Sequence, residues 1–392
     1  MKRASIRLLT ALLVNRCPVI LAVAMASAHG ADKQHIEPYF SGDIIAVDAR
    51  IDQQASQWFL DTGASATALF ATGASRLKIA SEPAEPFTVA GTRVEGRRAK
   101  ELDFEMFGQR ARLKLPILPW AHSYDGVLSW RNLNGTMLID GIERRIHALQ
   151  NLPARVGWQQ WEIEPQNSQL FISITRDGRP FGRVFIDTGV SGGLRLAPKL
   201  WAEWIAKHPS KSRTIERFQY AVGEPMVNEL AWADEYQLGD LAFHSLDIGP
   251  IPTAKDDSAL DKDGKEFIAT IGTRALRHMR IILSRATNEL WTQSIPEAPT
   301  HNRLGAVFLP QKEHNGALVC HVAHNSPAAD AGLRDGDQFV SVNDEKPHAD
   351  TKIQSQRLDA IFSEPPGTAV TLRVRRSGAE ITIHATLRNL LR

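Results

Sequence analysis

Short apolar segments recur along the chain, each about four to six residues long and separated by Gly, Pro or Asp. Runs of this length that are rich in β-branched and aromatic residues and bounded by turn formers favour strands over helices. Clear examples are residues 44–47, 58–60, 170–174 and 280–283. Helical patterns are fewer, and we predict helices at residues 198–207 and 349–362. The pattern therefore predicts a mainly β protein.

Two segments rich in turn formers divide these strands into three parts. Residues 151–167 and 294–300 are interpreted as linkers, and the charged residues 254–266 as a surface loop. A chain of 392 residues also exceeds the usual size of a single domain. We predict two similar domains and a smaller third one, with these bounds: 36–150, 165–293 and 303–390.

The N-terminal residues have the pattern of a secretory signal peptide. Lys2, Arg3 and Arg7 precede an apolar stretch at residues 19–26, and a small-residue exit ends at Ala28. We expect residues 1–28 to be removed on secretion. Removal also takes away Cys17 and leaves Cys320 as the one cysteine, so no intrachain disulfide is expected.

Composition and charge exclude several classes of protein. Hydrophobic residues make up 43% and charged residues 23%, which is ordinary for a globular chain. The formal net charge of +2 predicts no nucleic-acid partner. No apolar run reaches the roughly 20 residues of a membrane-spanning helix, so we expect no membrane span.

One cluster has residue types that could bind a metal. Cys320, His321 and His324 lie close together, but residues 317–323 alternate as in a strand and no fourth ligand is evident. We therefore expect ordinary strand packing here, with no metal site and no cofactor.

An internal repeat contains the candidate chemistry. Residues 59–65 read Phe-Leu-Asp-Thr-Gly-Ala-Ser, and residues 185–191 read Phe-Ile-Asp-Thr-Gly-Val-Ser. Each copy is followed by an apolar element, a helix-like turn and a further strand, at residues 125–139 and 268–283. A single Asp-Thr-Gly is a weak motif, but two copies in matched contexts are a strong signal.

The residue types of the repeat suit acid–base catalysis. Asp61 and Asp187 each follow a pair of apolar residues, which places each at the end of a buried strand. Two carboxylates held close together share a proton, so one can act as base on a water while the other acts as acid. The alternative is that each Asp-Thr-Gly is only a surface turn, because Asp and Gly are common turn formers.

These motifs resemble those of the aspartic proteases, both the retropepsins and the two-lobed pepsin-like enzymes. The resemblance covers about residues 38–292 and implies two β-barrel lobes with the active site between them. It also implies that Asp61 and Asp187 are the catalytic pair and that Thr62 and Thr188 bond across to the opposite loop. Because one chain holds both loops, we expect an active monomer.

The same resemblance assigns supporting roles around the pair. Gly63, Ser65, Gly189 and Ser191 complete the two loops, and glycine allows the backbone to turn tightly below each carboxylate. Downstream, Ile271-Gly272 fits the family pattern, whereas Ser129 stands where glycine is usual. Flap hairpins are placed at residues 89–92 and 221–224.

The residue three positions after each aspartate bears on the expected pH range. Pepsin-like enzymes usually have Ser or Thr there, whereas this chain has Ala64 and Val190. Without that hydroxyl the upper pKa of the pair rises, so we expect activity to peak at about pH 5 to 6.5. Ser65 and Ser191 are the residues that could replace the missing hydroxyls.

The C-terminal part resembles a PDZ domain of the type found in bacterial periplasmic proteases. The resemblance rests on residues 303–308 (Arg-Leu-Gly-Ala-Val-Phe) and residues 326–337, which begin Ser-Pro-Ala and end Gly-Asp. It implies that a peptide is added to an edge strand, with the helix at 349–362 as the other groove wall. The residues implied to bind the peptide carboxylate are Leu304, Gly305, Ala306 and Val307. The alternative is a packing module that binds nothing.

The sequence thus predicts a secreted aspartic endopeptidase of the bacterial periplasm, acting on protein or peptide substrates. Its PDZ domain is expected to bind C-terminal peptides. The alternative function is a non-catalytic peptide-binding or scaffold protein that retains the protease fold. Because both aspartates are present, we favour the enzyme.

Overall fold

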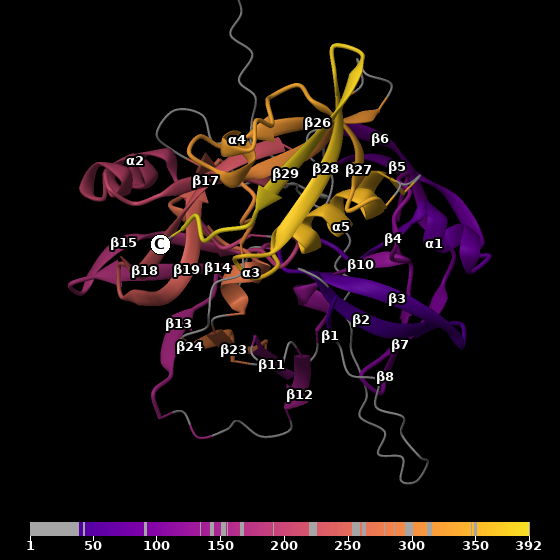
Figure 1. Cartoon of the computed structure of the whole chain (residues 1–392). Coiled ribbons are helices and arrows are strands. Elements are labelled where there is room, and N and C mark those ends of the chain that lie inside the picture. The colour runs from indigo at the N-terminus through magenta and orange to yellow at the C-terminus, as the bar shows by residue number, and fades with distance from the viewer. Residues whose placement is uncertain are drawn as a thin grey trace, which may run out of the picture. The chain divides into compact units, whose positions relative to one another are not determined.

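The computed structural model confirms the prediction of a mainly β chain (Figure 1). It describes residues 39–41, 44–89, 92–133, 135–141, 145–149, 154, 156–164, 168–190, 192–218, 226–252, 259–260, 264–277, 279–285, 287–294, 301–311, 316–345, 347–348 and 351–391. The predicted signal peptide lies outside these residues. The chain divides into two compact units, of which the first comprises residues 1–191, 238–241 and 259–295. The second comprises residues 192–237, 242–258 and 296–392.

The first repeat is built around a strand that ends at Asp61. This strand, β3 (Gln54–Asp61), pairs antiparallel with β2 (Ile44–Ile51) and parallel with β10 (Gly126–Ser129). Trp58, Phe59 and Leu60 are buried, so the strand is anchored by its side chains up to the aspartate. Around it lie α1 (Ala71–Arg76), β4 (Ala68–Phe70), β7 (Leu102–Met106), β8 (Gln109–Leu113), β9 (Ile117–Leu118) and the hairpin of β5 (Ser81–Val89) and β6 (Thr92–Ala99).

The second repeat has the same local topology. The strand β15 (Arg179–Ile186) leads into Asp187, pairs antiparallel with β14 (Phe171–Arg176) and pairs parallel with β22 (Ala269–Ile271). A short helical turn follows each of the parallel strands, namely η1 (Trp130–Asn132) and α3 (Thr273–Leu276). The helix-like turns predicted downstream of both motifs are therefore confirmed.

A shared sheet joins the two repeats within the first unit. The strand β11 (Thr136–Asp140) from the first repeat pairs antiparallel with β23 (Met279–Ser284) from the second, with Leu138 opposite Ile282. On either side lie β12 (Arg145–Leu149) with β1 (Tyr39–Ser41), and β24 (Glu289–Ser294) with β13 (Gln159–Glu162).

The interpretation of residues 151–167 as a linker was wrong at β13. β13 forms part of the residues 151–167 that were interpreted as a linker, because Trp161 is buried and the strand extends the shared sheet beside β24. In the described part of the predicted surface loop at 254–266, residues 260 and 264–266 are exposed, and β20 (Ala259–Leu260) pairs with β21 (Glu266–Phe267). Residues 254–258 and 261–263 lie outside the described residues.

The second unit contains a β-sheet and the C-terminal domain. The sheet strands are hydrogen-bonded in the order β16 (Leu194–Leu196), β19 (Leu241–Pro250), β18 (Met226–Leu238) and β17 (Arg213–Phe218). After β16 comes α2 (Pro198–Lys207), which has the predicted bounds and begins at a proline that suits the first helical turn.

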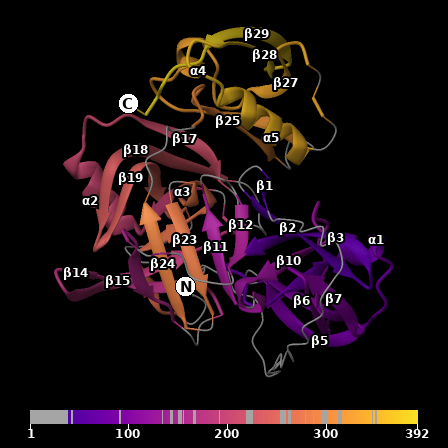
Figure 2. The same ribbon diagram turned by 90° about the horizontal axis from the view of Figure 1, so that it is seen from below.

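The C-terminal domain is a five-stranded antiparallel sheet with two helices (Figure 2). Its elements are β25 (Ala306–Gln311), β26 (Ala317–Val322), α4 (Pro327–Asp330), β27 (Gln338–Val342), α5 (Thr351–Phe362), β28 (Ala369–Arg376) and β29 (Ala379–Thr386). Leu358 and Phe362 of α5 pack with Phe308 and Leu372 in the domain core. The helix predicted at 349–362 is confirmed from residue 351 onward.

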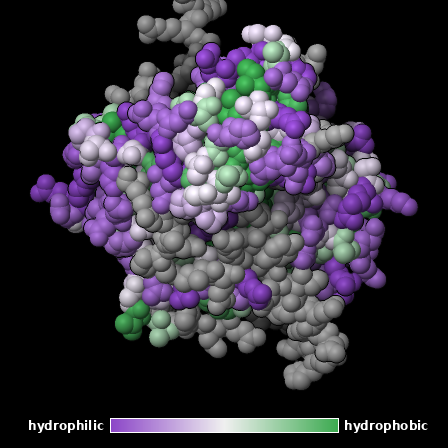
Figure 3. Space-filling view, in the orientation of Figure 1, coloured by the Kyte–Doolittle hydropathy of each residue, from purple (hydrophilic) through white to green (hydrophobic). Residues whose placement is uncertain are grey.

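Hydrophilic side chains predominate among the described residues on the face seen in Figure 3. Among the described residues, the large hydrophobic side chains that are exposed are Val156 and Leu260. No helix in the described part of the chain is long and apolar enough to cross a membrane.

Candidate functional site

Two acidic side chains are buried where β3 and β15 end. Asp61 is 8% exposed and Asp187 is 1% exposed. Each carboxylate accepts hydrogen bonds from the amides of its own loop: Asp61 Oδ1 from Gly63 N at 2.8 Å and Ala64 N at 3.0 Å, and Asp187 Oδ1 from Gly189 N at 2.9 Å. The tight loops therefore orient both carboxylates.

The two threonines tie the loops to one another. Thr62 N donates to Thr188 Oγ1 at 3.0 Å, and Thr188 N donates to Thr62 Oγ1 at 2.9 Å. Each hydroxyl also donates to a carbonyl that precedes the opposite aspartate, Thr188 Oγ1 to Leu60 O at 2.7 Å and Thr62 Oγ1 to Ile186 O at 2.5 Å. This reciprocal set of four bonds holds two segments that are 126 residues apart in sequence.

The two glycines allow the carboxylates to approach closely. A Cβ atom on Gly63 would lie 2.8 Å from Asp187 Oδ1, and one on Gly189 would lie 2.6 Å from the Asp61 carboxyl carbon. Real Cβ contacts are not this short, so each glycine packs directly against the opposite carboxylate. Glycine is needed here for space, because neither residue has a positive φ angle.

Burial changes the acidity of both groups. Loss of solvent raises the pKa of Asp61 to about 6, against the opposing effect of hydrogen bonds from Gly63, Asp187 and Ala64. Burial also raises the pKa of Asp187 well above its usual range, and the nearby charge of Asp61 raises it further. The pair therefore keeps a proton at pH values, between about 4 and 6, at which two separate surface aspartates would be ionised.

A polar side chain supports each loop from its downstream element. Ser129 Oγ donates to Ala64 O at 2.7 Å, and Thr273 Oγ1 donates to Val190 O at 3.1 Å. Ser129 replaces the expected glycine and uses its hydroxyl to hold the first loop. Sequence reasoning missed Thr273, although its place directly after Ile271-Gly272 matches that of a loop support.

Gln169 is a second residue that the sequence did not indicate. Its Nε2 donates to Gly63 O at 3.2 Å, and the next residue, Leu170, donates its backbone N–H to Thr62 O at 3.0 Å. The segment before β14 therefore holds the first loop. A buried glutamine without a motif offers no signal in a single sequence.

One predicted site residue does not support the pair, and others lie outside the described residues. Ser65 Oγ is buried and has no hydrogen-bond partner, so it does not replace the missing hydroxyl beside Asp61. Ser191 lies outside the described residues. The same holds for residues 90–91 and 221–224 of the predicted flaps, although Val89 and Thr92 end the two strands of the β5–β6 hairpin.

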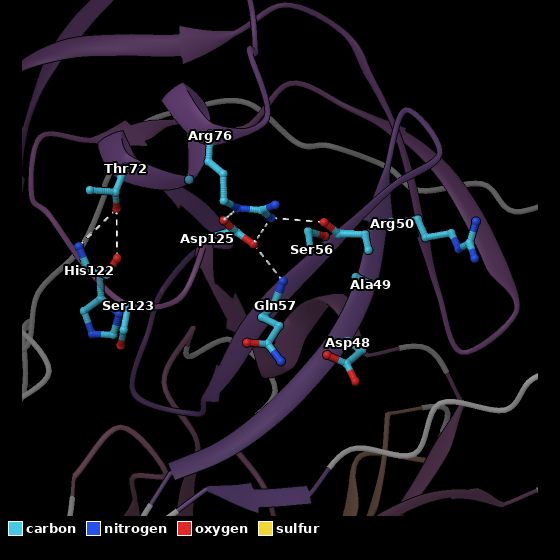
Figure 4. A pocket seen from close by; sticks show the side chains of 12 residues that line it. Asp48, Ala49, Arg50, Ser56, Gln57, Thr72, Arg76, His122, Ser123 and Asp125 are labelled. Carbon is cyan, nitrogen blue, oxygen red and sulfur yellow. Dashed lines mark hydrogen bonds and ion pairs between the residues drawn. The ribbon is translucent and has the colours of Figure 1, made fainter.

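A cavity of about 570 Å³ lies elsewhere in the first repeat (Figure 4). Its lining includes Asp125, Arg76 and Gln57 but neither Asp61 nor Asp187. Arg76 Nε donates to Asp125 Oδ1 at 2.8 Å, and Gln57 N donates to Asp125 Oδ2 at 2.8 Å. These bonds connect α1 to β3 and to the start of β10, so we interpret the ion pair of Arg76 and Asp125 as structural.

The C-terminal domain has a tight turn before its first strand. Gly305 has φ +73°, and a Cβ atom there would lie 2.3 Å from Ser326 Cβ. Ser326 Oγ in turn accepts from Ala329 N at 3.2 Å and so caps α4. The glycine and the serine of the sequence motif therefore pack against each other.

A family comparison identifies this domain. Residues 303–387 match the model of the PDZ domain family. These residues form a PDZ domain, which confirms the prediction for the C-terminal part. No curated protein sequence matches the chain. The family match leaves both Asp-Thr-Gly loops outside its limits.

In the described part of the chain, no group of three or more His, Cys, Asp or Glu side chains is arranged to hold a metal ion. Cys320 is buried in β26 among the apolar residues of the PDZ core. His321 follows it in the same strand.

Replacing Thr188 by Val should weaken the structure of the paired loops. The Val side chain keeps the size of Thr, but leaves Thr62 N without its acceptor and Leu60 O without its donor. We expect a loss of about 1 to 3 kcal/mol in the free energy of unfolding, measured by urea denaturation. Thr188→Ser keeps the hydroxyl and is the matched control. Equal losses in the two variants would contradict this role for the hydroxyl.

The buried pair should also make stability depend on pH. Unfolded aspartates titrate near pH 4, whereas burial raises the pKa of Asp61 in the folded chain to about 6 and raises that of Asp187 well above its usual value. Between these values the folded state binds more protons, so stability falls as pH rises from about 4 through 6.

Measured against Asp61→Asn/Asp187→Asn, the unfolding free energy of the unmodified chain should fall by about 1 to 3 kcal/mol between pH 4.5 and 7. The double variant keeps the amide acceptors and removes the titration. Parallel pH curves for the two proteins would exclude a buried, protonated pair.

Proposed function

We propose that the chain is an aspartic endopeptidase. The observation that carries this proposal is the pair of buried carboxylates, Asp61 and Asp187, on two loops that reciprocal threonine hydrogen bonds join. In each repeat a strand pairs parallel with the one that leads into the aspartate, β10 with β3 and β22 with β15. This arrangement supports the two-lobed aspartic protease fold that the motifs resemble. Both loops belong to one unit of a single chain, so we propose that the monomer is active.

The hydrogen bond between the two carboxyl groups suggests a role for each. Burial raises the pKa of both groups, but this hydrogen bond lowers the pKa of Asp61 and raises that of Asp187. We therefore assign the ionised form to Asp61, which accepts a proton from a water. The water oxygen attacks the carbonyl carbon of the peptide bond, while protonated Asp187 donates its proton to the carbonyl oxygen. Collapse of this tetrahedral intermediate, with proton transfer to the leaving nitrogen, yields a carboxylic acid and an amine.

The PDZ domain supports a peptide ligand for the second unit. PDZ domains bind extended peptides by adding them as a strand to a sheet edge. We propose that this domain captures protein or peptide substrates. The N-terminal sequence pattern supports secretion, and we propose the bacterial periplasm as the location.

A second candidate function rests on the PDZ domain alone. The family match covers only residues 303–387, and a chain that uses only these residues would be a non-catalytic peptide-binding or scaffold protein. The two proposals differ in whether Asp61 and Asp187 are needed for chemistry.

Replacing either aspartate by asparagine should abolish hydrolysis. Asn keeps the shape and the acceptor oxygen toward Gly63 N or Gly189 N, but it can neither take up nor supply the catalytic proton. We expect a loss of at least about a thousandfold in kcat/KM for Asp61→Asn and for Asp187→Asn in a digest of a peptide library. Asp103→Asn, at a largely exposed position, is the control.

Activity in none of the proteins, with all of them folded, would favour the scaffold function. Retention of most activity by either aspartate variant would contradict the catalytic pair.

The pH dependence of kcat/KM should report the shared proton. Below about pH 6 both carboxylates are protonated, so activity should rise as pH increases through that value and fall when Asp187 loses its proton. Because both groups are buried, we expect the maximum of kcat/KM at or above the upper end of the range of pH 5 to 6.5 that the sequence predicts. A maximum near pH 2 to 3 would show that another donor stabilises the ionised form.

A further inference from the structure

The residues that directly follow the PDZ domain pack onto the sheet of the second unit. Leu390 and Leu391 form one apolar cluster with Leu230 and Trp232 of β18, and all four side chains are less than 10% exposed. Burial of such apolar side chains away from water favours this association. The domain is therefore attached by more than a linker.

The edge of β25 is the place where a peptide would be added. β25 is the terminal strand of the five-stranded sheet and begins directly after the Leu304-Gly305 turn. Ala323 N donates to Gly305 O, and Cys320 N is turned away from β25 to Asp337 O. Residues of an antiparallel strand direct their backbone N–H and C=O groups alternately toward the paired strand and away from it. Phe308 lies opposite Cys320, so the backbone groups of Ala306 and Phe308 are directed to the open edge of β25.

The chain's own strand β17 lies beside this edge strand (Figure 2). Ala306 and Phe308 belong to the PDZ core, whereas Val307 and Leu309 point to the opposite face of the strand and lie outside that core cluster. Val307 is nevertheless only 2% exposed and Leu309 7%. A strand buried on both faces has a second packing partner, and β17 is the element next to it.

An ion pair connects β17 to the other wall of the groove. Arg217 Nη2 of β17 lies 3.5 Å from Asp359 Oδ2 of α5. The Arg217 side chain is 14% exposed and that of Asp359 is 48% exposed. β17 therefore contacts both β25 and α5, the two elements between which a peptide would be bound.

The turn that would bind a peptide carboxylate is also occupied. Asn302 Oδ1 accepts from Leu304 N at 3.0 Å and from Gly305 N at 2.9 Å. Asn302 Nδ2 donates to Ala306 O at 2.7 Å, on the open edge of β25. The side-chain amide thus makes the bonds that a peptide terminus would make at this turn.

We infer that the peptide groove of the PDZ domain is covered by the chain itself, and that a peptide ligand binds only by displacing β17 and Asn302. The inference rests on the proposed peptide-binding function of the domain. Because docking and peptide binding use the same surface, each weakens the other by the same factor. The peptide ligand is an extended segment with a free C-terminal carboxylate, as the occupied turn amides indicate.

The covering can be tested without any peptide. Amide hydrogen exchange of residues 304–311 is measured in the full chain and in two variants that loosen docking by different means. Asp359→Arg places two positive charges together, and Leu391→Ala removes an apolar contact with β18. We expect exchange to be about three to thirtyfold faster in both variants.

Asp344→Arg makes the same charge change at an exposed site of the same domain, where Asp344 pairs with Arg373. It is the matched control, and its exchange should equal that of the unmodified chain. Unchanged exchange in both docking variants would overturn the covering.

Competition is tested in the full chain carrying Asp61→Asn, so that bound peptides are not cut. The probe is a pool of random decapeptides with free C-terminal carboxylates, and the same pool with amidated ends is the control. Immobilised Asp359→Arg and Leu391→Ala proteins should retain at least about three times more of the carboxylate pool than the unmodified or Asp344→Arg protein.

Equal retention by all four proteins would overturn the inference. Faster exchange together with no retention of any peptide would show that the domain does not bind peptides, and would thereby overturn the proposed competition. The hydrolysis assay is independent of both results, because it depends on Asp61 and Asp187.

Discussion

The first unit depends on two carboxylates that are buried together although both tend to ionise. Burial raises the pKa of each, and the charge of Asp61 raises that of Asp187 further. Three kinds of contact keep the groups in place: the amides of each loop, the crossed threonine bonds, and glycines that leave no side chain between the loops. A site that costs stability in this way persists only when its surroundings hold it, and it is typical of catalytic positions.

The surroundings provide this support twice, with one topology. In each repeat a buried strand ends at the aspartate and a parallel strand passes beside it. A hydroxyl from the downstream element, Ser129 or Thr273, then holds the loop from behind. The pairing of β11 with β23 joins the two repeats in one sheet. The geometry of the pair therefore follows from the whole unit, because no single loop places both carboxylates.

The second unit combines a recognition domain with the surface that restrains it. The PDZ domain is anchored on β18 by Leu390 and Leu391, and β17 lies along its edge strand. An exposed sheet edge is a site for unwanted strand pairing, so covering it also protects the chain from aggregation. A ligand that displaces β17 from β25 would expose apolar side chains that the second unit otherwise buries. Recognition and conformational change are thereby linked in one unit.

The sequence by itself determined the strand-rich class, the PDZ domain and the two Asp-Thr-Gly loops. It also determined the bounds of α2, because period, turn residues and motif spacing are local properties of the chain. Only the tertiary structure decided that β13 extends the shared sheet and that Gln169 and Thr273 hold the loops. The same is true of the contact between Arg217 and Asp359. These contacts join residues far apart in sequence, and their partners are set by packing, which leaves no pattern in a single chain.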